Sequence, residues 1–149
     1  MRLILRLIIV PCMALSSCTD RDEVLYTKLD GTWTLNQIKV YRPYDDSIAT
    51  FNSATINFNS CDKKESPCDG WIMIGTEKYR FEFQVSNPKN ASQRVSMTFL
   101  NIKSEDYKKY DWSGPYDLRM SEKELILECA GCALASRHGG SMFEIKATR

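Results

Sequence analysis

Apolar and polar residues alternate with a period of two along most of the chain, the pattern of strands that bury one face. The clearest run covers residues 79–85, where four apolar side chains alternate with Arg80, Glu82 and Gln84. Turn-forming residues such as Asn87 and Pro88 separate this run from the next. No comparable stretch has apolar residues spaced 3.6 apart, so the pattern predicts an all-β protein.

The alternation predicts eight strands, over residues 32–41, 53–60, 70–76, 78–85, 93–102, 116–120, 123–129 and 141–148. A change of parity near Leu100 indicates a bulge or a strand end there. Eight antiparallel strands with short connections fit an up-and-down barrel, because closing the sheet removes its exposed edges. A β-sandwich is the alternative architecture. Outside these strands, only residues 104–110 are compatible with a helical turn.

Length and composition are those of one globular domain. The chain has 149 residues, of which 43% are hydrophobic and 26% charged, and no apolar run reaches the roughly 18 residues that span a bilayer. Its 20 Lys and Arg residues nearly balance 19 Asp and Glu residues, giving a net charge of +1. Such a balance does not favour nucleic acid as a partner.

The N-terminus has the features of an export signal. Arg2 and Arg6 precede a short apolar stretch over residues 7–15. The sequence Leu15–Ser16–Ser17–Cys18 that follows resembles the lipobox of bacterial lipoproteins. The resemblance implies that residues 1–17 are a signal peptide, that Cys18 is lipidated, and that 18–28 form a polar tether before a domain over 29–149.

The same resemblance implies a location and a partner. A lipidated Cys18 would hold the protein in a bacterial membrane, since two or more acyl chains such as palmitate anchor a protein stably. Thr19, rather than an acidic residue, follows the cysteine, which in Gram-negative lipoproteins implies transfer to the outer membrane. We therefore expect a lipid-anchored protein of the cell envelope, periplasmic or surface-exposed.

The start of the first predicted strand carries a second resemblance. Gly31, Thr32 and Trp33 form a G-x-W motif, and followed by a β-meander of this length it resembles the lipocalin-like domains of bacterial lipoproteins. The resemblance implies that Trp33 packs across the closed end of the barrel. The chain departs from the animal lipocalin pattern: residues 104–107 resemble the second motif only loosely, and no arginine near the C-terminus is matched to the third.

Four cysteines follow Cys18, and an even number in an exported chain favours disulfides. They are Cys61, Cys68, Cys129 and Cys132. The second and seventh inter-strand loops lie at opposite ends of an up-and-down barrel, so we expect the local bridges Cys61–Cys68 and Cys129–Cys132. A four-cysteine zinc site and a redox role for the Cys-x-x-Cys pair are the alternatives.

No set of residues in the sequence assembles an active site. His138 is the sole histidine, and with Gly139 and Gly140 beside it the sequence predicts an exposed loop residue. There is no G-x-S-x-G elbow for a nucleophilic serine. We therefore expect neither an enzyme nor a bound metal or cofactor.

The barrel interior is the remaining candidate site. Six large apolar residues of the two clearest strands would line it: Tyr79, Phe81, Phe83, Val95, Met97 and Phe99. An eight-stranded barrel is wide enough for side chains or for one small ligand. The prediction is a binding protein for a small, mainly apolar ligand. The alternative is a structural or protein-partner-binding envelope lipoprotein, in which these residues form a filled core.

Overall fold

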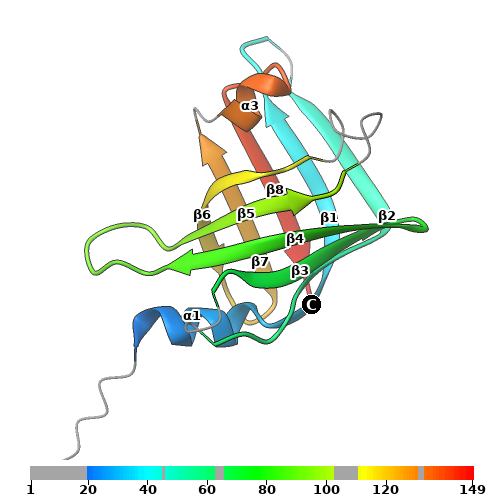
Figure 1. Ribbon diagram of the computed structural model, residues 1–149. Helices are drawn as coiled ribbons and strands as arrows, with labels where there is room; N and C mark the ends of the chain where they lie inside the picture. Colours follow the sequence, from blue (N-terminus) through cyan, green and yellow to red (C-terminus); the bar gives the residue numbers. More distant parts are fainter. Residues whose placement is uncertain (1–19, 45, 63–65, 103–110, 131–132) are drawn as a thin grey trace, which may run out of the picture.

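The computed structural model describes residues 20–44, 46–62, 66–102, 111–130 and 133–149. Eight strands lie in these ranges: β1 (Gly31–Tyr41), β2 (Ser47–Phe58), β3 (Cys68–Ile74), β4 (Glu77–Ser86), β5 (Arg94–Leu100), β6 (Gly114–Met120), β7 (Glu124–Ala130) and β8 (Met142–Thr148). Each strand pairs with the next antiparallel, and β8 pairs with β1 to close a barrel (Figure 1). The predicted all-β up-and-down barrel is confirmed, and the sandwich is excluded.

The first hairpin differs most from the predicted strand boundaries. β2 begins at Ser47 rather than at residue 53, and its first half pairs with β1 alone, because β3 pairs with β2 only from Ala54 onward. In this half both faces of β2 are largely solvent-exposed, so its sequence does not alternate. β5 ends at Leu100, as the change of parity indicated, and Asn101 follows with a positive φ of 53°.

The segment expected to be a polar tether is instead mostly helical. α1 (Arg21–Leu29) starts after Asp20, whose carboxylate accepts a hydrogen bond from the Asp22 backbone N–H at 2.9 Å. Leu25 and Leu29 are buried, because one side of the helix packs against the barrel. Within the described ranges, neither helix is long and apolar enough to cross a membrane.

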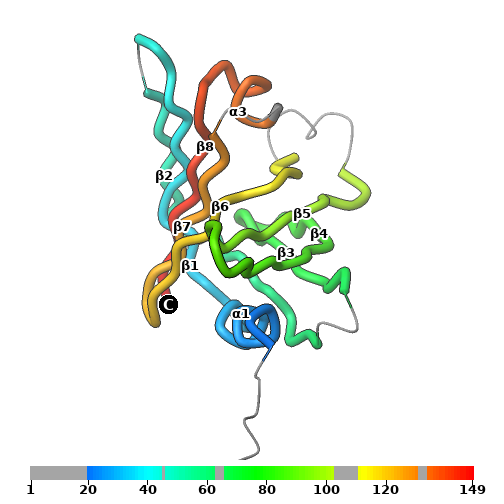
Figure 2. The backbone as a smooth tube through the Cα atoms, turned by 90° about the vertical axis from the view of Figure 1, so that its left-hand side faces the viewer, coloured from blue at the N-terminus to red at the C-terminus, as the bar shows by residue number. Residues whose placement is uncertain are grey.

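The two helices in the described part of the chain lie at opposite ends of the barrel. α1 lies across the end that also carries the C-terminus, whereas α3 (Ala133–Arg137) lies at the other end (Figures 1 and 2). Asp22 accepts a hydrogen bond from the Asn87 N–H at 2.7 Å, which fixes α1 to the connection between β4 and β5. The α1 end is called the closed end below, and the other the α3 end.

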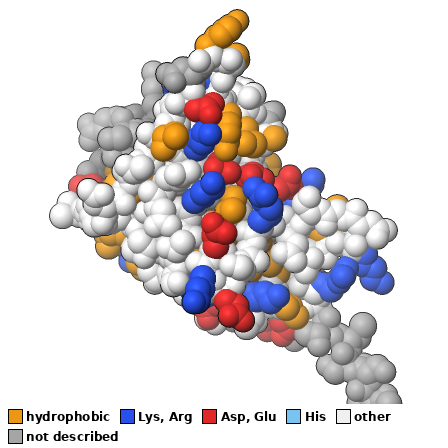
Figure 3. Space-filling view, turned by 180° about the vertical axis from the view of Figure 1, so that it is seen from behind, with side chains coloured by type: hydrophobic (Ala, Val, Ile, Leu, Met, Phe, Trp, Pro, Cys, Tyr) orange, Lys and Arg blue, Asp and Glu red, His pale blue; other side chains and the backbone are white. Residues whose placement is uncertain are grey.

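Inward and outward side chains follow the predicted alternation. Inward residues of every strand join one buried apolar cluster, and positive and negative side chains are interspersed on the outside (Figure 3). Trp71 is a half-exposed outer residue of β3, with the Lys78 ammonium 4.8 Å from its ring centre. At Gly70 the neighbouring Phe81 ring approaches so closely that any Cβ would overlap it, which explains a glycine inside a strand.

Candidate functional site

A continuous file of aromatic rings runs through the barrel from one end to the other. Its members are Tyr26, Phe83, Phe58, Phe81, Phe99, Trp112 and Phe143, with neighbouring ring centres between 5.0 and 6.4 Å apart. Several pairs meet edge to face, a favourable arrangement for aromatic rings. The rings come from α1, from β2, β4, β5 and β8, and from the residue that precedes β6 by two positions.

The six residues predicted to line the interior do point inward. Four of them are at most 1% exposed: Phe81, Phe83, Val95 and Met97. Tyr79 is buried, and Phe99 is half-buried against the core. β4 and β5 pair in register, so Phe81 lies opposite Phe99 and Phe83 opposite Met97. Their interior position is therefore confirmed, and contact with a ligand stays a prediction.

At the closed end, Trp33 is the central side chain. It is completely buried, and its indole N–H donates to the Leu29 carbonyl oxygen at 2.9 Å. The Arg149 guanidinium lies 3.9 Å from the Trp33 ring centre and donates to the backbone carbonyls of Lys28, Asp30 and Glu122. Arg149 thus joins α1, the β6–β7 turn and Trp33, a role that the sequence did not indicate.

Tyr26 connects the closed end to the file of rings. Its hydroxyl donates to the Ser66 hydroxyl and accepts from the Val85 N–H, both at 3.2 Å. Its ring centre lies 5.9 Å from that of Phe83. This tyrosine falls in the segment that the sequence analysis took for a tether, and the i, i+4 spacing of Leu25 and Leu29 is the signal that could have revealed the helix.

The α3 end contains a buried ion pair. Asp111 is 3% exposed and accepts a bond of 2.6 Å from the Arg137 guanidinium. Tyr116 is completely buried beside it and donates to the Trp112 carbonyl oxygen at 2.6 Å. Burial, together with the nearby Asp111 charge, raises the pKa of the Tyr116 hydroxyl well above its usual value, so this hydroxyl stays protonated.

The expectation of an exposed His138 is wrong. Its ring lies against Phe143, with the centres 5.1 Å apart, and its Nε2 atom is buried. Burial lowers the pKa of this imidazole, and the positive charges of Arg137 and Arg42 lower it further. His138 directly follows α3. The sequence analysis did not predict this helix, so it could not predict that the imidazole is partly buried.

The cysteines pair locally where the structure describes them. Cys61 and Cys68 form a disulfide with a Cα–Cα distance of 5.9 Å, which closes the β2–β3 connection. Because these two thiols are joined to each other, the four-cysteine zinc site is wrong. Cys129 is also disulfide-bonded, but Cys132 lies outside the described residues, and the Cys129–Cys132 bridge stays a prediction.

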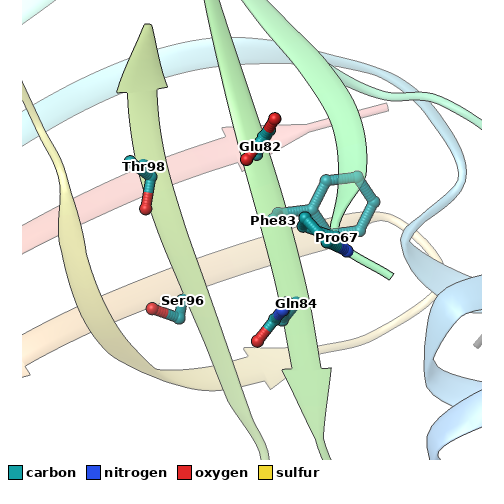
Figure 4. A pocket seen from close by; sticks show the side chains of 6 residues that line it. All are labelled: Pro67, Glu82, Phe83, Gln84, Ser96 and Thr98. Atoms are coloured by element: carbon teal, nitrogen blue, oxygen red, sulfur yellow. The ribbon is translucent and has the colours of Figure 1, made fainter. Parts of the chain in front are cut away.

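Some hollows lie on the outside of the barrel. One of about 160 Å³ is lined by outward side chains of β4 and β5, by Pro67 and by the edge of the inward residue Phe83 (Figure 4). Glu82, Gln84, Ser96 and Thr98 form its polar floor. This hollow is smaller than the roughly 300 Å³ at which small-molecule pockets begin. A hollow of about 430 Å³ lies at the closed end, where its lining combines the charged residues Lys28, Glu122 and Arg149 with Met120 and Ser121, and more of the exposed lining is apolar than polar.

Comparison with known proteins adds no assignment. The sequence matches no protein-family model and no curated protein. The class of protein is thus given by the structure alone: a closed eight-stranded antiparallel barrel with an aromatic core. Residues 1–19, including the signal peptide and Cys18, and the loosely matched motif at 104–107 lie outside the described residues.

Proposed function

We propose that this chain is a lipoprotein of the bacterial cell envelope whose lipocalin-like barrel binds a small, mainly apolar ligand. The observation that carries the proposal is the file of rings through the closed barrel. Aromatic and aliphatic side chains line most small-molecule sites, and a few polar groups orient the ligand. Here the polar groups gather at the α3 end, around Asp111, Arg137 and His138.

The closed end supports the lipocalin-like resemblance. Trp33 belongs to the G-x-W motif and packs under α1 at the end where the resemblance placed it. The Arg149 guanidinium covers its ring, so an arginine near the C-terminus does meet this tryptophan. α1 begins at Arg21, three positions after Cys18. A lipid on Cys18 would therefore hold the closed end near the membrane and turn the α3 end away from it.

Ligand binding is tested with the full chain in mild detergent. We expect the apolar dye N-phenyl-1-naphthylamine to bind one site with saturable fluorescence, because the barrel interior shields it from water. The variant Met97→Trp, which adds bulk to the interior, should lose this binding at least tenfold. Met73→Trp is the matched control, since Met73 points outward from β3 and is half-exposed.

Equal binding by the two tryptophan variants would place the dye outside the barrel and contradict the proposal. Native mass spectrometry of protein purified from its own envelope supplies the physiological counterpart. We expect a bound small molecule that the Met97→Trp protein lacks.

A ligand-free structural or partner-binding lipoprotein is the second candidate. The rings of the file contact one another, as those of a filled core do. If the wild-type chain binds no dye and carries no small molecule, this candidate replaces the first.

The membrane anchor has its own test. Cys18→Ser should release the protein from the membrane fraction, because the proposed lipid anchor is built on this cysteine and a serine has no thiol to receive it. Cys12→Ser is the control, since Cys12 lies in the apolar stretch before the lipobox and should leave attachment unchanged. Fractionation and mass spectrometry of the N-terminus measure the outcome. A wild-type protein that starts elsewhere without lipid would contradict the proposed anchor.

A further inference from the structure

His138 is held firmly at the α3 end of the barrel. Its backbone N–H donates to the Leu134 carbonyl at 3.2 Å, and its carbonyl accepts from the Arg42 guanidinium at 3.1 Å. Gly140, two residues later, lies so close to the Tyr41 carbonyl that a Cβ would overlap it. β1 and α3 thus fix the backbone on both sides of the imidazole.

The imidazole has a buried nitrogen that no described residue satisfies. Nε2 of His138 is buried and has no hydrogen-bond partner among the described residues. Most buried polar atoms in proteins are paired, since leaving one unpaired is unfavourable. A nitrogen held in this state by a fixed backbone is therefore an available binding contact.

The surroundings of this nitrogen combine aromatic rings with positive charge. Phe143 lies against the imidazole and, with its ring centre 6.4 Å from that of Trp112, connects it to the file of rings. Arg137 and Arg42 are the neighbouring cations, and Asp111 is the neighbouring anion that bonds Arg137. The two arginines disfavour a protonated imidazole and a positively charged ligand.

We propose that Nε2 of His138 is the polar contact for the ligand of the barrel, and that this ligand is a neutral, mostly apolar molecule with a hydroxyl group. This inference rests on the proposed function and narrows its ligand class. A hydroxyl can donate to an unprotonated Nε2 or accept from a protonated one, so it fits either tautomer of the neutral ring. A carboxylate can only accept, and only from an Nε2 that carries the proton, and burying its charge in the apolar interior costs more than burying a hydroxyl.

Three compounds of nearly equal size test the inference: naphthalene, 2-naphthol and 2-naphthoate. Their affinities for the full chain are measured by displacement of N-phenyl-1-naphthylamine. We expect 2-naphthol to bind about tenfold more tightly than naphthalene, the preference of one buried hydrogen bond, and 2-naphthoate to bind more weakly than 2-naphthol. In His138→Phe, which keeps a ring against Phe143, the hydroxyl preference should disappear while naphthalene still binds.

Stability separates a binding role from a structural one. Because His138→Phe removes an unsatisfied buried atom, its melting temperature without ligand should equal or exceed that of the wild type. A lower melting temperature with an unchanged hydroxyl preference would show that His138 is structural. His138→Gln, which retains a hydrogen-bonding group, should keep part of the preference and provides a second variant if His138→Phe does not fold.

The wild-type protein gives a measurement that needs no variant. His138 is the sole histidine, so its imidazole ¹⁵N signals are unambiguous. We expect the Nε2 signal to shift with 2-naphthol and to stay in place with naphthalene. Equal affinity for these two compounds, or tightest binding of 2-naphthoate, would overturn this inference and leave the proposed function standing. Failure of the dye and all three compounds to bind would overturn both.

Discussion

Trp33→Ala should lower the free energy of unfolding by about 3–5 kcal/mol, the usual cost of truncating a large aromatic side chain in a core. The substitution removes a completely buried indole and its hydrogen bond to Leu29. It also removes the ring on which the Arg149 guanidinium lies. For a domain of ordinary stability this is a large fraction of the total.

Urea unfolding of the full chain in mild detergent measures the effect. Trp71→Ala is the matched control, because Trp71 is a half-exposed outer residue of β3, and we expect it to cost about 1 kcal/mol or less. Similar losses for both variants would show that Trp33 does not hold the closed end together. The lipocalin-like resemblance would then lose its main structural support.

Arg137→Leu, at the α3 end of the barrel, should lower the free energy of unfolding by about 3 kcal/mol. The variant removes the guanidinium that neutralises the buried Asp111 carboxylate, and breaking such a pair is far more harmful than replacing both partners. Removing one partner of a buried ion pair usually costs about 3–5 kcal/mol of stability. We expect a loss at the lower end of this range because the Arg137 side chain is 34% exposed, and solvent screens part of the interaction.

The control for this prediction is Arg119→Leu. Arg119 pairs with Glu128 on the outer face, and its side chain is 63% exposed, so its loss should cost about 0–1 kcal/mol. Both variants are compared by urea unfolding at one pH. Equal effects would contradict a special role for the Asp111–Arg137 pair.

The barrel was predictable because strand alternation reflects a physical requirement that every strand of a barrel shares. One face of each strand meets the apolar interior, as Phe81 and Phe83 do, and the other meets water. The Cys61–Cys68 bridge was predictable for a related reason, since strand parity places each loop at a known end.

The helices and the long-range contacts were harder to predict. α1 has nine residues and one short apolar side, although Asp20 followed by Glu23 resembles the start of a helix. Arg149 meets Trp33 across more than a hundred residues, and no local pattern encodes such a pair. The burial of His138 depends on α3, which has five residues, too few for a periodic signal.

The three tryptophans lie in three different parts of the molecule, so the fluorescence of each reports on a different region. Trp33 reports on the closed end, Trp112 on the interior near α3, and Trp71 on the outer surface. Phenylalanine at two of these positions would leave a single emitter at the third. Emission from Trp112 alone would then register events inside the barrel, while Trp71 alone would register only those at its surface. The native sequence thus supplies its own reporters of where a molecule binds, without any attached label.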